Sequence, residues 1–205
     1  MEALYNRLIK TPLFAEVLAL LDKTLSPTLR YHTVDHTRDV IREVITLGML
    51  DKLAPRDLEL LGCAALFHDS GFMEGHADHE ERGAELAARK LNATGEYSPE
   101  EIDLVSSMIR DTRILPEPTI PCQHASSPLA CYLLDADVAN FGRADFWEKS
   151  NQAREEAGGK EQEFLQQTVA LLNRHRWLTT AGEQRFGVIK AHNLQLLRDR
   201  ISSLI

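Results

Sequence analysis

The most constraining feature of this chain is an unbroken apolar run that ends in a histidine and an aspartate. The run covers residues 58–67 and contains no proline, so it predicts a buried helix. His68 and Asp69 follow at once, and then Ser70-Gly71, where a glycine is expected to end the helix. Ionisable side chains at the end of a buried helix are costly unless they are paired or bind a metal. By itself the dipeptide fits a hydrogen-bonded core pair as well as a metal site.

Helical periodicity extends over most of the 205 residues. The expected helices cover about residues 2–10, 12–25, 33–47, 58–67, 79–93, 99–112, 129–139, 144–157, 160–176 and 181–203. Residues 114–128 contain four prolines, too many for a helix or an interior strand, and predict an ordered crossing loop. Because no strand alternation, repeat or linker is evident, we expect an all-α fold with residues 1–205 in a single domain.

Composition narrows the class of partners. The formal net charge of −8 argues against a nucleic-acid groove, which needs a basic stripe. No stretch approaches the roughly 18–20 apolar residues of a membrane span, and polar residues interrupt any signal-peptide pattern at the N-terminus. The three cysteines form no CxxC motif and are interpreted as reduced thiols. We therefore expect a cytoplasmic protein that binds neither nucleic acid nor membrane.

Two further helices bring polar side chains into apolar faces. In the helix expected to open near Thr33 and to close at Gly48, one face carries His32, His36, Val40, Val44 and Leu47. The helix over about 129–139 presents Asp135 and Asp137 in a run that otherwise resembles core. Two imidazoles and two carboxylates from three helices make a plausible octahedral site for a divalent ion, with open positions for water. The proposed ligands are His36, His68, Asp69 and Asp137.

At this point the sequence resembles the HD superfamily of metal-dependent phosphohydrolases, whose pattern is H…HD…D. The matching pieces lie in residues 31–36, 66–72 and 134–138, followed by Phe141-Gly142. The resemblance covers about residues 28–145, and residues 146–205 form a helical extension without an assignable motif. It implies a helical HD-domain fold and hydrolysis of a phosphate ester, often of a nucleotide, by metal-activated water.

The resemblance also assigns the third motif. The family's ligand there is the aspartate of an Ala-Asp pair, which is Asp137. Since two helical steps turn by about 200°, Asp135 and Asp137 cannot both face one ion. We therefore favour Asp137 as the ligand and assign Asp135 a supporting or capping role.

The number of ions depends on a departure from the family pattern. Two-metal members often carry a histidine in a motif of the type I-x-x-H-T, whereas this chain has Asp111 at that position. His76 and His79 are possible substitutes. We therefore expect one divalent ion (Mn, Mg, Fe, Ni, Co or Zn) and keep a two-metal site as the alternative.

Supporting roles are assigned to a few neighbouring residues. Glu74 lies in a loop after the HD pair, where one-metal nucleotidases of the family place a catalytic acid, so Glu74 is predicted to act with Asp69. His32, His79 and Arg110 are predicted to bind substrate. Each has an ordinary structural interpretation: Glu74 as a loop acid, His79 and His32 as helix-end residues, and Arg110 as a solvated cation.

The sequence thus predicts a phosphohydrolase that acts on a small phosphorylated molecule, with a nucleotide phosphomonoester as the preferred substrate. The alternatives are a non-catalytic HD domain that binds a nucleotide or metal in signalling, and a two-metal phosphodiesterase. A di-iron oxygenase on this scaffold would need histidines that we cannot place. Homodimerisation is left open.

Overall fold

The structure, a computed structural model, describes residues 2–114, 124–158 and 160–203, so most of the predicted crossing loop lies outside the described residues. Within these ranges the chain is helical and has no strand, which confirms the all-α class. The elements are α1 (Glu2–Leu8), α2 (Pro12–Thr24), α3 (Val34–Leu50), α4 (Pro55–Phe67), the 3₁₀ helix η1 (Ser70–Glu74), α5 (His79–Thr94), α6 (Pro99–Asp111), α7 (Ala130–Asp137), the 3₁₀ helix η2 (Ala139–Gly142), α8 (Phe146–Ala157), α9 (Glu161–Arg174) and α10 (Thr180–Ser202).

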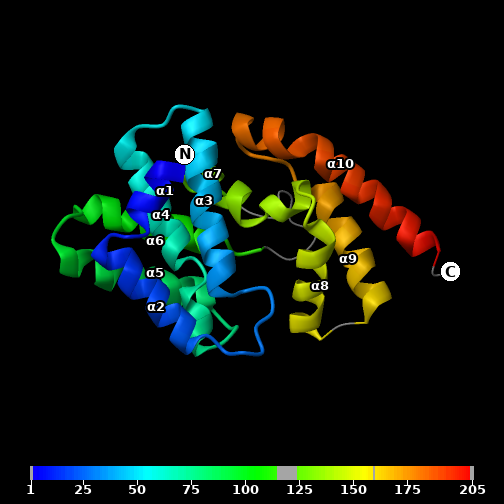
Figure 1. The fold of residues 1–205 in the computed structure, drawn as a ribbon, viewed down its shortest axis with the longest axis horizontal. Helices are drawn as coiled ribbons and strands as arrows, with labels where there is room; N and C mark the ends of the chain where they lie inside the picture. The colour runs from blue at the N-terminus through cyan, green and yellow to red at the C-terminus, as the bar shows by residue number, and fades with distance from the viewer. Residues whose placement is uncertain (1, 115–123, 159, 204–205) are drawn as a thin grey trace.

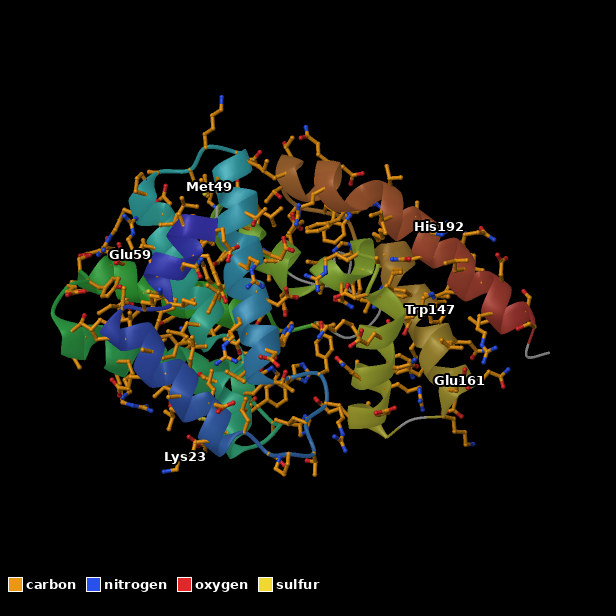
Figure 2. The ribbon with its side chains drawn as sticks, viewed as in Figure 1. Lys23, Met49, Glu59, Trp147, Glu161 and His192 are labelled. Carbon is orange, nitrogen blue, oxygen red and sulfur yellow. The ribbon has the colours of Figure 1, made fainter. Side chains whose placement is uncertain are left out.

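The helices form two groups on either side of α3 and α7 (Figure 1). Helices α1, α2, α4, α5 and α6 gather on one side, and α8, α9 and α10 gather on the other. Buried apolar side chains run through both groups, from Tyr5 on α1 to Leu197 on α10. Met49, near the end of α3, and His192, on α10, lie at the periphery (Figure 2). One continuous core therefore supports the motif helices and the C-terminal helices together.

The apolar run behaves as the sequence predicts, because every residue from Leu60 to Phe67 in α4 is buried. The helix ends at Phe67, close to the expected position, but the expectation that a glycine stops it is wrong. Gly71 lies inside η1, where a Cβ would come 2.0 Å from the backbone oxygen of His79. Its lack of a side chain permits close packing of η1 on the start of α5.

Gly48 corrects the predicted end of the preceding helix. Helix α3 continues through Gly48 to Leu50. A Cβ at Gly48 would lie 2.5 Å from the Leu58 side chain, so this glycine allows α3 and α4 to approach each other. Glycine at a helix end and glycine at a close helix contact give the same sequence signal.

An ion-pair network joins the C-terminal helices to α3. Arg143 lies 2.7 Å from Asp39 and 3.3 Å from Glu43, both on α3, and 2.6 Å from Asp145 next to α8. Arg185 on α10 also pairs with Glu43, at 3.1 Å. Because the Glu43 side chain is only 6% exposed, loss of one of its partners would leave a buried charge less well paired. The network holds α8 and α10 against the helix that carries His36.

Among the described helices, none is both long enough and apolar enough to cross a membrane.

Candidate metal centre

Three helices deliver polar side chains to one point in the interior. His36 lies in the first turn of α3, where the side chain of Thr33 caps the helix by accepting the backbone N–H of His36. His68 and Asp69 follow the last residue of α4, and Asp137 is the last residue of α7. The structure thus brings together the four side chains that the sequence proposes as ligands.

The ligand atoms of these four side chains form a compact cluster. His36 Nε2 lies 3.2 Å from Asp137 Oδ1 and 3.5 Å from Asp69 Oδ2. His68 Nε2 lies 3.1 Å from Asp69 Oδ2 and 3.5 Å from Asp137 Oδ1. The two Nε2 atoms are 3.4 Å apart. Ligand atoms that share a divalent ion at about 2.0–2.2 Å are about 3 Å from one another, so the cluster is close to the spacing that an ion requires.

Neighbouring groups orient the two imidazoles. The Nδ1 of His68 lies 2.8 Å from the backbone oxygen of Ala65, and a proton donated there leaves Nε2 facing the cluster. The ring of Tyr31 packs on the ring of His36 with centroids 4.6 Å apart, and the Tyr31 hydroxyl lies 3.2 Å from Asn140 Oδ1. Both imidazoles are buried. Their positions are therefore set by the fold before any ion binds.

The cluster has the two features that a cation site needs: negatively charged carboxylates and an oxygen without a well-aligned hydrogen bond. Burial would raise the pKa of Asp69 and Asp137, but the His68 and His36 imidazoles outweigh it and hold both values well below the usual range. In turn, Asp69 and Asp137 raise the pKa of the buried His68 well above its ordinary value, against the effect of burial. Asp69 Oδ2 is buried and receives no well-aligned hydrogen bond from the described residues. Buried polar atoms normally have a partner, so this oxygen fits a metal ligand.

Asp135 has a different environment from Asp137. Its carboxylate accepts the backbone N–H groups of Leu178 and Thr179, at 2.8 and 2.9 Å, and the Thr179 hydroxyl at 2.7 Å. Burial raises the pKa of Asp135 to about 6, although these three donors oppose the shift. A Cβ at Gly182 would lie 2.3 Å from Asp135 Oδ2, so the start of α10 packs closely on this group. Asp135 therefore fixes α10, in keeping with the supporting role expected for it.

Glu74, the predicted catalytic acid, is the last residue of η1 and is exposed. Within the described part of the chain it forms no hydrogen bond or ion pair. Its catalytic role stays a prediction.

His79 is adjacent to the cluster, whereas Asp111 has another function. His79 Nε2 lies 4.0 Å from Asp69 Oδ1, the oxygen that does not face the two cluster imidazoles. The rings of His79 and His76 both contact Phe72, with centroid separations of 4.0 and 5.1 Å. Asp111 accepts the backbone N–H and the hydroxyl of Ser126, at 2.7 and 2.6 Å. The aspartate at the family's histidine position thus holds the chain just before α7.

The guanidinium of Arg110 is already paired. Its Nε and Nη2 bind the two Glu81 oxygens at 2.8 and 2.7 Å, across the surface between α6 and α5. Nearby, Arg113 lies 3.3 Å from Glu80 and 3.5 Å from Asp78. A phosphate that binds Arg110 would have to compete with a bidentate carboxylate. The predicted substrate contact of Arg110 stays a prediction.

His32 lies beside the cluster, in the segment before α3. Its ring stacks on Phe72 at 4.2 Å and lies 6.1 Å from the ring of His36. Burial lowers the pKa of His32, but Asp69 and then Glu156 outweigh burial and raise it. The raised pKa favours the protonated imidazole, and a protonated ring next to the candidate metal centre suits the predicted contact with a substrate phosphate.

Sequence reasoning missed Glu156, which holds the segment that carries His32. The Glu156 carboxylate accepts the backbone N–H groups of Arg30, Tyr31 and His32 at 2.8, 2.9 and 3.2 Å, and it also contacts His32 Nδ1. Burial opposes ionisation, but the His32 ring and these N–H groups lower the pKa of Glu156 to about 2. In the sequence, Glu156 follows Glu155 in an amphipathic helix and resembles a solvated acid, so nothing marked it.

We expect Glu156→Gln to lower kcat/KM for the predicted hydrolysis of a phosphomonoester by about 10- to 100-fold, since a hydrogen bond to a charged group contributes about 1.5–3 kcal/mol. The amide can donate to His32 but cannot provide the anionic acceptor that orients its ring. Bound metal should stay unchanged. Phosphate release and metal content check this, with Glu155→Gln as the control because Glu155 is exposed on the same helix. Equal effects of the two substitutions would contradict the role of Glu156 in orienting His32.

Comparisons with known proteins support the fold. No protein-family model matches the chain, and no curated protein matches it. One solved structure, described as a predicted HD superfamily hydrolase from an uncultured Thermotogales bacterium, is similar over 95% of this chain and 97% of its own. The TM-score is 0.60 and the sequence identity is 20%. The predicted resemblance is thus confirmed at the level of the fold, and the chain has the HD-domain fold.

Proposed function

We propose that the chain is a metal-dependent phosphohydrolase that cleaves the phosphate ester of a small molecule, with a nucleotide phosphomonoester as the first candidate. The observation that carries this proposal is the convergence of two imidazoles and two carboxylates. Asp69 Oδ2 faces both imidazoles and receives no well-aligned hydrogen bond from the described residues. His36, His68, Asp69 and Asp137 would hold the ion. A divalent ion supplies two effects in such sites: it lowers the pKa of water and polarises a phosphoryl oxygen.

The chain's own residues have distinct parts in this proposal. His32, held by Glu156, would present its ring to the substrate phosphate, and its raised pKa favours the protonated form. Tyr31 packs on the His36 ring and fixes one ligand. Glu74, at the end of the η1 helix that follows Asp69, is the candidate proton donor for the leaving oxygen, and its exposed position allows exchange with solvent.

Preference for a monoester follows from the proposed single ion. A two-metal site stabilises both the attacking and the leaving oxygen and therefore suits a diester with a poor leaving group. Here the position that the family pattern gives to a second-metal histidine is occupied by Asp111, which accepts a hydrogen bond from Ser126. The opposing observation is the 4.0 Å separation between His79 Nε2 and Asp69 Oδ1, which would favour a second ion. A two-metal phosphodiesterase is therefore the second candidate.

The proposal is tested by a substrate panel on protein loaded with each of the candidate divalent ions in turn. Adenosine 5′-monophosphate and p-nitrophenyl phosphate represent monoesters, and a cyclic dinucleotide represents diesters. We expect release of inorganic phosphate from the monoesters and little cleavage of the diester. Preferred cleavage of the cyclic dinucleotide would favour the phosphodiesterase. Metal binding with no cleavage of any ester would favour a non-catalytic binding domain.

A further inference from the structure

A cavity of about 300 Å³ opens next to the candidate metal centre, between the motif core and the C-terminal helices. Asp137 and His32 line it from the motif core, while side chains of α8 and α9 line it from the extension. In Figure 1, α8 lies beside the chain segment that leads into α3, and the Glu156 contacts join the two. The volume is at the lower end of the range for small-molecule sites. We call this cavity the α8–α9 pocket.

The α8–α9 pocket is continuous with the place where a phosphate would react. Because Asp137 belongs both to the ligand cluster and to the pocket lining, a phosphoryl group at the cluster has the pocket directly beside it. The organic part of a bound ester must extend away from the cluster. The pocket is a concave space with the dimensions to receive it.

The pocket walls are mainly apolar. Phe141, Phe164, Leu171, Val138 and Ala153 contribute hydrocarbon surface from η2, α8, α9 and the segment before η2. Such walls favour a ligand that removes apolar surface from water. Aromatic side chains also pack well against a planar ring.

Several polar groups of the lining are engaged within the protein, whereas Lys149, Ser150 and Gln167 form no side-chain hydrogen bond or ion pair with the described residues. The Thr168 hydroxyl donates to the Phe164 backbone oxygen at 2.8 Å, and Asn140 Oδ1 lies 3.2 Å from the Tyr31 hydroxyl. Lys149 is the only formally charged residue that α8 and α9 contribute to the described lining. A sugar alcohol without a ring would lose hydration against the apolar walls and would gain few matching partners. A ligand that carries a planar ring would bury that ring against the apolar walls and would lose less.

We propose that the α8–α9 pocket binds the organic half of the substrate and selects an uncharged alcohol that carries a planar ring. A nucleoside and a substituted phenol share this chemistry. The inference rests on the proposed function, because it describes the ligand as part of a substrate. The pocket can still be tested without hydrolysis, since the released alcohol should bind by itself.

The test measures binding of adenosine, p-cresol and glycerol to metal-free protein by calorimetry. We expect adenosine or p-cresol, but not glycerol, to bind, and the difference between the first two tells a nucleoside pocket from a phenol pocket. Ala153→Phe places a ring in the cavity and should weaken binding at least tenfold. Ala157→Phe is the matched control, since Ala157 is exposed one turn later on α8 and does not line the cavity. It should change binding less than twofold.

Phe164→Ala provides a second variant in case the larger side chain disturbs folding, which circular dichroism would reveal. It removes one apolar wall and should also weaken binding. Equal binding of glycerol, or unchanged binding in both pocket variants, would overturn the pocket assignment even if phosphate esters are hydrolysed. Alcohol binding that depends on Ala153, in a protein that hydrolyses no ester, would leave the pocket standing and contradict the proposed function alone.

Discussion

Asp69→Ala is expected to abolish both metal binding and ester hydrolysis while the helical fold persists. The Asp69 carboxylate lies within 3.5 Å of both cluster imidazoles, yet its inner oxygen receives no well-aligned hydrogen bond from the described residues. The side chain thus contributes ligand chemistry more than packing. The loss of activity should exceed the about 10- to 100-fold that removal of an outer-sphere partner costs.

His68→Ala should give the same result, because His68 provides the other half of the dipeptide and its Nδ1 is engaged by Ala65. Metal content, phosphate release and far-ultraviolet circular dichroism are the three measurements. Asp103→Ala, an exposed position on α6, is the control. Loss of the fold with metal still bound at the wild-type level would show that these side chains serve the core instead.

The second large effect separates two aspartates that lie two residues apart. Asp137→Asn should weaken metal binding strongly and change the free energy of unfolding little, since Asp137 Oδ1 lies in the ligand cluster. Asp135→Asn should do the reverse. Its amide would meet three donors at the start of α10, and an unsatisfied buried group of this kind costs about 1–3 kcal/mol.

Denaturant unfolding and metal titration of both variants check this pair. Each substitution is the control for the other, because both replace a carboxylate by an amide on the same helix. Equal losses of metal affinity, or a larger loss in Asp135→Asn, would mean that the third motif is aligned on the wrong residue.

The sequence was sufficient to predict the helical architecture and the meeting of four polar side chains in the core, because both have local signals. Apolar periodicity predicts helices, and the HD pair at the end of residues 58–67 indicates where a polar cluster enters the core. Helix geometry indicated that Asp135 and Asp137 cannot both face one ion, and the family resemblance then favoured Asp137. The structure places the two side chains in different surroundings because they point to different sides of α7.

Other features have no local signal. Gly48 and Gly71 were interpreted as helix ends, but both allow close packing against the helix that follows in the chain. Glu156 acts on residues more than 120 positions away, and a glutamate in an amphipathic helix is indistinguishable from a solvated one. The α8–α9 pocket likewise depends on how residues without a motif pack against η2 and the segment before α3. Such long-range relations are defined by tertiary packing.

The central claim is that this cluster binds one ion and that the ion makes the protein a phosphohydrolase. The most direct measurement is to titrate manganese into metal-free protein while recording bound metal and phosphate release from p-nitrophenyl phosphate. We predict that activity rises in proportion to the bound ion and levels off at about one ion per chain. Activity that begins only as a second ion binds, or no hydrolysis at full occupancy, would contradict it.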